Sequence, residues 1–143
     1  MKILCLSLIS FFVLLSCKSK EEIAPNGLVG KWVATGLTQS MNQDSTWSAW
    51  RVNPTFASVT PSIWEFTNDR KFLRDGKPAA ECCFAGNRYA VSGNKITFTE
   101  TATNCANVLC YNCGTNYWEF SKPTDDTLIL QQCITRNQFV RVK

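Results

Sequence analysis

Cysteine usage constrains this chain more than any other feature of its sequence. Its 143 residues include eight cysteines and no histidine. Eight cysteines are too many for an ordinary cytosolic domain, so they indicate either an oxidising compartment or a metal site. The absence of histidine excludes Ser-His-Asp and Cys-His catalytic pairs, imidazole metal ligands and a histidine pH switch. The length fits a single domain, and a hydrophobic fraction of 45% with only 18% charged residues excludes a disordered chain.

The first segment has the features of an export signal. Met1-Lys2 is basic, and residues 3–15 are almost wholly apolar, a run too short to cross a bilayer of about 30 Å as a helix. The run ends in Leu14-Leu15-Ser16-Cys17, which resembles the bacterial lipoprotein signal. That resemblance implies that residues 1–16 are a signal peptide and that Cys17 becomes an acylated membrane anchor, palmitate being one of the acyl chains. An ordinary secretory signal is the alternative.

Residues 17–27 are expected to form a lipidated N-terminus and a flexible tether. They are polar and end in a Pro-Asn-Gly stretch, a composition typical of linkers. The Glu21-Glu22 pair resembles the acidic export signal of surface lipoproteins in the Bacteroidetes, although lysines precede it here. A role in keeping the linker solvated is the alternative. We therefore predict anchoring at the bacterial outer membrane, on its periplasmic or its surface face.

From residue 28 onward the chain shows the period of β-strands. Apolar residues alternate over short runs that are separated by turn residues, and no helical period is evident. Strands are expected at 30–38, 62–67, 72–74, 88–92, 95–101, 116–121, 127–130 and 137–142, with one further candidate at 47–52. Short turns favour antiparallel neighbours, and closing the meander removes exposed edges. The prediction for residues 28–143 is an all-β fold, a small antiparallel up-and-down barrel of about eight strands, stapled by disulfides.

The two ends of this region carry a family resemblance. Leu28-Val29-Gly30-Lys31-Trp32 opens the first strand, and Phe139-Val140-Arg141-Val142-Lys143 ends the last. With the aromatic-x-aromatic strands between them, these segments resemble the small lipocalin-like domains of Bacteroidetes lipoproteins. The resemblance implies that Trp32 is a structural plug at the closed end of a barrel and that Arg141, or else Arg136, packs over it. It also implies a pocket for a small apolar ligand at the open end.

The bulky residues of the strands allow three interpretations of the interior: a solid core, the wall of a lipid pocket, or a core with a small vestibule. Trp47 and Trp50 lie in or beside the polar segment 42–48, where they either contact a hydrophobic or carbohydrate surface or fold back as a lid. The candidate ligand-binding residues are Trp47, Trp50, Trp64, Phe66, Tyr89, Phe98, Trp118 and Phe120, and the other interior candidates are Phe72, Val91, Ile96, Leu128 and Leu130.

Six cysteines remain once Cys5 is removed with the signal and Cys17 is lipidated. The disulfide candidates are Cys82, Cys83, Cys105, Cys110, Cys113 and Cys133. Adjacent cysteines rarely bond to each other, so we expect Cys82 and Cys83 to pair elsewhere, which ties two long loops together and reaches Cys133. Two alternatives are a redox motif at 110–113 and a zinc site with four cysteine ligands.

No residue pattern indicates an enzyme. Glu65 and Glu119 adjoin tryptophans and could form a glycosidase-like pair, but solvent-facing positions on half-buried strands are favoured. We expect no cofactor and no metal, and the small positive charge argues against a nucleic-acid partner. The predicted function is a monomeric, membrane-anchored lipoprotein that binds a small hydrophobic ligand. The alternative is a filled barrel that acts as a structural or inhibitory module for protein or glycan contacts in the cell envelope.

Overall fold

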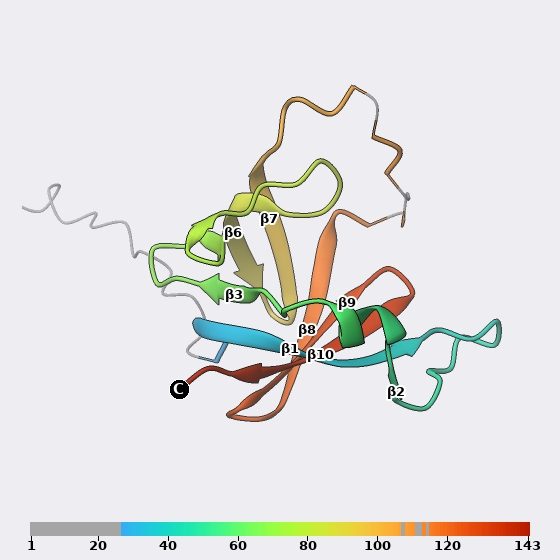
Figure 1. The fold of residues 1–143 in the computed structure, drawn as a ribbon. Coiled ribbons are helices and arrows are strands. Elements are labelled where there is room, and N and C mark those ends of the chain that lie inside the picture. Colours follow the sequence, from blue (N-terminus) through green and yellow to red (C-terminus); the bar gives the residue numbers. More distant parts are fainter. Residues whose placement is uncertain (1–26, 107, 111–112, 114) are drawn as a thin grey trace, which may run out of the picture.

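The computed structural model describes residues 27–143, except 107, 111, 112 and 114. The described residues form ten strands of one antiparallel sheet and a short 3-10 helix, so the predicted all-β fold is confirmed (Figure 1). The elements are β1 (Gly30–Ser40), β2 (Arg51–Val52), η2 (Pro54–Ser58), β3 (Ile63–Phe66), β4 (Phe72–Arg74), β5 (Lys77–Pro78), β6 (Gly86–Ser92), β7 (Lys95–Thr101), β8 (Tyr117–Thr124), β9 (Thr127–Gln132) and β10 (Thr135–Arg141).

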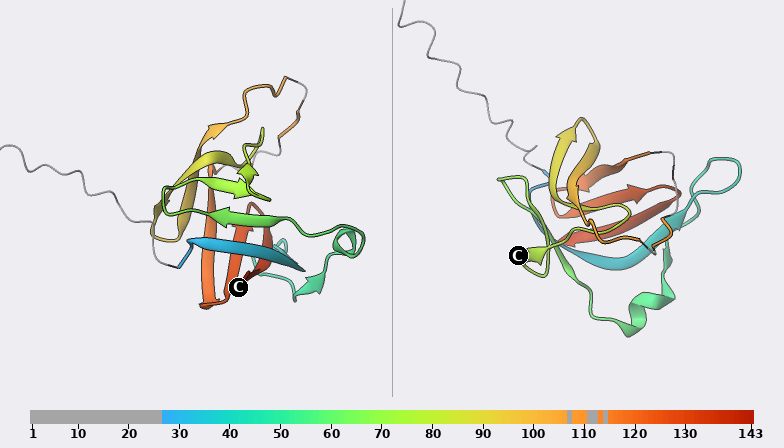
Figure 2. Two further views of the ribbon diagram at one scale, coloured as in Figure 1. Left: turned by 60° about the vertical axis from the view of Figure 1, so that its left-hand side comes forward. Right: turned by 90° about the horizontal axis from the view of Figure 1, so that it is seen from above.

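The sheet curls into a nearly closed barrel (Figures 1 and 2). Its strand order is β5-β4-β3-β1-β10-β9-β8-β7-β6, with β2 paired to β1. Strands that follow one another in the chain are therefore neighbours from β3 to β5 and from β6 to β10, while β1 joins the first group to β10. The expected up-and-down arrangement follows from this order, because short turns connect antiparallel neighbours.

A short contact between β4 and β6, termed the seam, brings the two sides of the sheet together. Lys71 and Arg88 form an isolated antiparallel bridge, and the Tyr89 backbone N–H donates to the Arg70 carbonyl at 2.9 Å. The Tyr89 hydroxyl donates to the Thr67 carbonyl at 2.8 Å. Burial raises the pKa of Tyr89 to about 12, because it disfavours the charged phenolate. The hydroxyl is therefore present as a donor across the neutral pH range.

Several expected strand boundaries differ from those in the structure, and three of the differences have a clear local cause or extent. β8 continues through Pro123, and the turn that follows is confined to Asp125-Asp126. A register shift between Ser121 and Thr124 explains why a proline is tolerated there, since an irregular ladder position needs no N–H donor. The candidate strand at 47–52 shrinks to β2, and the last strand begins at residue 135 because Cys133-Ile134 forms a tight turn.

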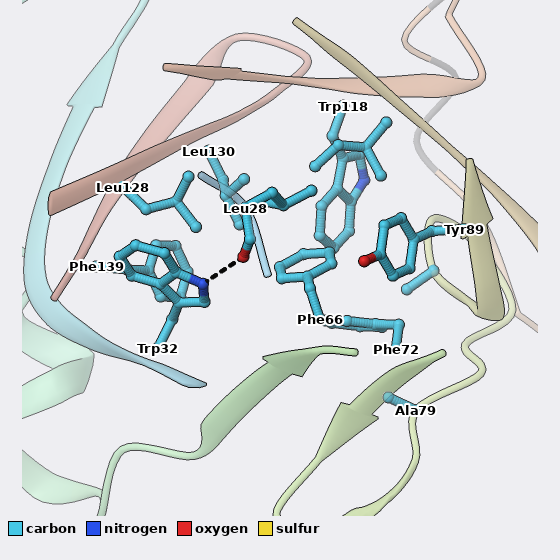
Figure 3. Packing of buried hydrophobic residues seen from close by; sticks show 12 residues of the cluster. Leu28, Trp32, Phe66, Phe72, Ala79, Tyr89, Trp118, Leu128, Leu130 and Phe139 are labelled. Carbon is cyan, nitrogen blue, oxygen red and sulfur yellow. Dashed lines mark hydrogen bonds between the residues drawn. The ribbon is translucent and has the colours of Figure 1, made fainter. Parts of the chain in front are cut away.

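Aromatic rings fill the interior of the barrel. The Trp64 ring centroid lies 5.5 Å from that of Phe72 and 5.6 Å from that of Trp118, and Phe98 lies 4.6 Å from Trp118. Figure 3 shows how the buried side chains of the cluster, Phe72 and Trp118 among them, converge. The buried core consists of Leu28, Trp32, Phe66, Phe72, Ala79, Ala85, Tyr89, Ile96, Trp118, Leu128, Leu130 and Phe139, with Trp64, Phe84, Val91, Phe98 and Phe120 among the partly buried residues packed against it. This packing excludes the wall of a wide lipid pocket and leaves a solid core or a core with a small vestibule.

Trp32 closes one end of the barrel, termed the closed end. Its ring is completely buried, and its Nε1–H donates to the Leu28 carbonyl at 2.8 Å (Figure 3). The Arg141 guanidinium carbon lies 4.2 Å from the Trp32 ring centroid. The same guanidinium donates to the carbonyls of Val29 at 3.0 Å and Gly27 at 3.2 Å. The arrangement has the geometry expected of a plug, and it also holds the start of the described chain at this end.

The N-terminal predictions lie outside the described residues. These are the signal peptide at 1–16, the lipidation site Cys17 and the tether up to residue 26. Within the part of the chain that the structure describes, no helix is long and apolar enough to cross a membrane.

Candidate functional site

Three disulfides gather at the end of the barrel opposite Trp32, termed the open end. They join Cys82 to Cys105, Cys83 to Cys110 and Cys113 to Cys133, with Cα–Cα distances of 5.5, 5.2 and 5.1 Å. The first two bonds tie the β5–β6 loop to the β7–β8 loop, and the third ties the β7–β8 loop to the β9–β10 turn. The expectation that Cys82 and Cys83 pair elsewhere and tie the two long loops together is confirmed, and the network reaches Cys133 through Cys113.

The disulfide pairing also decides between the alternatives for these cysteines. Cys110 and Cys113 have different disulfide partners, so the interpretation of residues 110–113 as a redox motif is wrong. All six sulfurs are bonded in pairs, which leaves no thiolates for a four-cysteine zinc site. Among the described residues, no group of three or more cysteine, aspartate or glutamate side chains is placed to hold a metal ion.

A pocket of about 130 Å³, termed the mouth pocket, lies at the open end. Phe98 and Trp118 reach it from inside the barrel, and Phe84 reaches it from the β5–β6 loop. Its lining consists of Cys83, Phe84, Phe98, Thr101, Cys113, Thr115, Asn116, Tyr117, Trp118, Gln132 and Cys133. None of these side chains carries a charge. A pocket of this size holds a group of roughly six heavy atoms, because a cavity of about 150 Å³ accommodates benzene.

A second hollow of about 300 Å³, termed the outer groove, runs along the outside of β8 and β9. Its lining consists of Met41, Cys113, Thr115, Tyr117, Glu119, Gln131, Cys133 and Ile134. Cys113, Thr115, Tyr117 and Cys133 belong to both hollows, so the outer groove adjoins the mouth pocket across the third disulfide. A third hollow of about 340 Å³ lies beside Phe84 and the β9–β10 turn. The concave surface of the open end therefore centres on the Cys113–Cys133 bond.

One residue that lines the mouth pocket has a buried polar atom without a partner. Trp118 is only 2% exposed, and its Nε1 is buried without a hydrogen-bond partner among the described residues. Arg74 is in a comparable state on the other side of Trp64. Its Nε is buried and unpaired, while its Nη2 forms an ion pair with Glu81 and its guanidinium lies 5.3 Å from the Trp64 ring centroid. Buried donors of this kind are uncommon in folded proteins, and both of these atoms are enclosed by their neighbours rather than exposed to a hollow.

The segment between β1 and β2, which carries Trp47 and Trp50, projects from the barrel (Figure 1) and starts beside the β9–β10 turn, where the Met41 backbone N–H donates to the Ile134 carbonyl at 2.8 Å. Trp47 bridges to Met41, and the Arg136 guanidinium lies 3.9 Å from its ring centroid. Trp50 is 37% exposed. Neither residue lines the mouth pocket, so the structure does not place them as a lid. Trp47 instead lies next to the outer groove, because Met41 lines that groove.

The other candidate ligand-binding residues belong mainly to the core. Trp64, Phe66, Tyr89 and Phe120 are buried or partly buried in the barrel, and only Phe98 and Trp118 also line the mouth pocket. The pocket residues that sequence reasoning missed are Phe84, Thr101, Thr115, Asn116, Tyr117 and Gln132. Most of them lie in loops or at strand ends next to a disulfide, so the neighbours of paired cysteines are the sequence signal that could have found them.

The structure does not bring Glu65 and Glu119 together. Glu65 lies on β3, where it is paired with Lys31 at 4.0 Å, and Glu119 lies on β8, registered with Gln131 and Lys95. β1, β10 and β9 separate the two strands in the sheet. The glycosidase-like pair therefore has no counterpart in this fold.

Comparisons with protein-family models, with curated proteins and with solved structures find no match for this chain. The lipocalin-like resemblance thus stays a prediction, and function is inferred from the geometry of the chain itself.

Proposed function

We propose that this protein is a lipid-anchored lipoprotein of the bacterial outer membrane whose open end binds a protein or glycan of the envelope. Its barrel is a non-enzymatic scaffold for that surface. The observation that carries the proposal is the placement of all three disulfides at the end opposite Gly27, where the described chain begins. An anchor at Cys17 then leaves the closed end nearest the membrane and points the disulfide-linked loops away from it.

The filled interior favours this function over transport of a small apolar ligand. Pockets for drug-sized ligands measure about 300–1,000 Å³ and are mostly enclosed. The mouth pocket has about 130 Å³, and the space beneath it is occupied by rings that contact one another, such as Phe72, Phe98 and Trp118. A ligand that entered the barrel would have to displace this core. The larger hollows lie on the surface, as expected for contact with a macromolecule.

Disulfides at a binding surface have a specific physical advantage. Each of these bonds closes a loop of 20 to 27 residues and is worth about 2–4 kcal/mol. Loops that are ordered before binding lose less conformational entropy on binding. Apolar side chains are exposed on the same loops: Leu109 is fully exposed, and Val108 and Ile134 are about half exposed. Apolar groups held in water by covalent staples are typical of a contact surface.

The lipid anchor is tested by labelling cells with an alkyne analogue of palmitate. We expect label on the wild-type protein and on the matched control Cys5→Ser, and none on Cys17→Ser, which should leave the membrane fraction. Label that persists on Cys17→Ser, or an unlabelled wild type, would contradict the anchor.

The binding surface is tested by a photo-crosslinking amino acid placed at single positions in living cells. Ile134 at the open end is compared with Val140, an exposed residue of similar size on the outer face near the closed end. We expect a discrete adduct from position 134 and none from position 140. Adducts from position 140 alone, or from neither position, would refute a binding surface at the open end.

A further inference from the structure

We infer that the protein inhibits a protease that cleaves after apolar residues, by presenting Leu109 to the specificity pocket of that protease in the manner of a substrate. The inference rests on the proposed function, for which it specifies the partner as a protein and assigns the contact to one loop. It is carried by a covalent ring at the open end, termed the cysteine ring, which consists of residues 105–110 and 82–83.

The cysteine ring exists because two disulfides end on adjacent residues. Cys105 is bonded to Cys82 and Cys110 to Cys83, with Cα–Cα distances of 5.5 and 5.2 Å. Six residues of the β7–β8 loop and two of the β5–β6 loop therefore close into a ring of eight residues. A closed ring of this size leaves its backbone far fewer conformations than an open loop of the same length has.

The base of the cysteine ring is attached to the barrel. The Glu81 N–H donates to the Ala85 carbonyl at 2.7 Å, and the Ala102 N–H donates to the Glu81 carbonyl at 3.3 Å. Ala85 is completely buried, and Phe84 packs against the core. The segment that follows β7 extends away from the strands (Figure 1). The ring is thus held at residues 82–83 and carries the β7–β8 loop beyond the barrel.

Leu109 offers a protease both a side chain and an unpaired backbone. Its side chain is fully exposed, and residues 108–110 belong to neither helix, strand nor turn. Among the described residues, no hydrogen-bond partner is found for the backbone N–H or carbonyl of Leu109. A protein cleft that recognises an extended peptide pairs with its backbone and takes individual side chains into pockets. Proteases select their substrates through one such pocket.

The charge of the loop indicates which kind of specificity pocket it fits. No charged side chain occurs from residue 101 to residue 118. Charged residues are depleted at the core of protein interfaces, and burying an unpaired charge is costly. Leucine gains free energy only from an apolar pocket, since an acidic pocket needs a basic side chain. The partner is therefore a protease with an apolar specificity pocket.

The cysteine ring explains why the loop would inhibit rather than serve as a substrate. Hydrolysis of the Leu109–Cys110 peptide bond breaks its C–N bond, adds the hydroxyl of water to the Leu109 carbonyl carbon and a proton to the Cys110 nitrogen. Cys110 stays attached to Cys83, and Leu109 stays attached through Cys105 to Cys82. The reverse reaction, which releases the water, is then intramolecular and has a high effective concentration. A loop without the ring would lose its contact after one cut.

The test measures the inhibition of chymotrypsin, whose specificity pocket is apolar, by the chain that begins at residue 17 with Cys17→Ser. We expect stoichiometric inhibition, and Leu109→Gly should raise the inhibition constant at least about tenfold because the burial of leucine is lost. Leu109→Arg should transfer inhibition to trypsin, whose pocket is acidic. The matched control Val52→Arg replaces an exposed apolar residue of β2, outside the ring, and should leave the inhibition of chymotrypsin unchanged.

Mass spectrometry follows the peptide bond during the same incubation. We expect the intact form to persist beside a form that is heavier by one water and separates into two fragments only after reduction. Opening the ring by Cys83→Ser with Cys110→Ser, in a variant whose circular dichroism matches the wild type, should convert the loop into a substrate that is cleaved progressively. Progressive cleavage of the wild type with loss of inhibition, or undiminished inhibition by the opened variant, would overturn the inference.

The outcomes separate the protease from the wider proposal. If the wild type does not inhibit chymotrypsin, or Leu109→Gly inhibits equally well, while position 134 still gives a crosslinked adduct, the protease inference is refuted and the open-end surface stands. If position 134 gives no adduct, the proposed function itself fails.

Discussion

Replacing Arg141 by alanine should remove much of the stability of the closed end. Arg141 stacks on the buried Trp32 ring at 4.2 Å and donates to the carbonyls of Val29 at 3.0 Å and Gly27 at 3.2 Å. Hydrogen bonds from a charged donor contribute about 1.5–3 kcal/mol each. The side chain is about one quarter exposed, so we take the lower value for both bonds and add about 0.5–1 kcal/mol for the stack. The expected loss is about 3.5–4 kcal/mol.

The loss is measured by urea unfolding followed through tryptophan fluorescence. With a slope of about 1–3 kcal/mol per molar urea, the midpoint should fall by about 2 M. Arg141→Lys keeps the charge but cannot present two fixed donors to two carbonyls, so it should recover only part of the loss.

Arg136→Ala is the matched control, because Arg136 also stacks on a tryptophan. Its guanidinium lies 3.9 Å from Trp47 and donates to Gln131, but the Trp47 loop is on the outside of the barrel. We expect a loss below about 1 kcal/mol, as for other exposed cation–π contacts. Equal losses from the two alanine variants, or a loss below about 1 kcal/mol from Arg141→Ala, would refute the assignment of Arg141 to the plug.

Two further experiments test the packing and the electrostatics of the barrel. Gly86→Ala should destabilise the protein by about 2 kcal/mol or more in urea unfolding, because its Cβ would overlap the Thr99 carbonyl. The control Gly93→Asn lies in an open turn at positive φ and should be tolerated. Similar urea midpoints for the two variants would contradict the close approach of Gly86 to Thr99. A hydrogen bond from Lys71 lowers the pKa of Asp69 to about 2, so its contribution to stability is present above pH 4 and disappears as the pH falls through about 2. Asp69→Asn should therefore lower the melting temperature slightly at pH 6 and by a smaller amount at pH 2, and equal differences at the two pH values would contradict this assignment.

Local sequence pattern predicted the strands because their determinants are local. Alternation and turn residues located most of the barrel strands, and the Gly93-Asn94 hairpin is where it was expected. The prediction ended this strand at residue 121, before Pro123, because the sequence does not show the bulge that lets β8 continue through the proline. Phe139 was missed as a core residue because the adjacent Val140 is also apolar, and only the register with β1 shows which of the two faces inward.

The candidate site was less predictable because it depends on which loops meet when the barrel closes. The pairing of Cys113 with Cys133 joins segments that are brought together by β8 and β9, and no local spacing encodes it. Alternating aromatic residues predict an inward face, but they do not reveal whether rings from opposite strands fill the space between them. Trp64 and Trp118 contact each other across the interior, and this contact shows that the rings form a packed core.

The seam between β4 and β6 is where we expect the barrel to open first, and this opening determines how the protein would self-associate. It includes the Lys71–Arg88 bridge and two hydrogen bonds made by Tyr89, and it is much shorter than the ladders that join β1 to β10 and β6 to β7. If it opens, the free edge of β6 becomes a template on which a second molecule can add a strand. The bonds of Cys82 and Cys83 keep β6 beside β7 during such an opening. Self-association at high concentration should therefore give strand-exchanged dimers that retain every native disulfide.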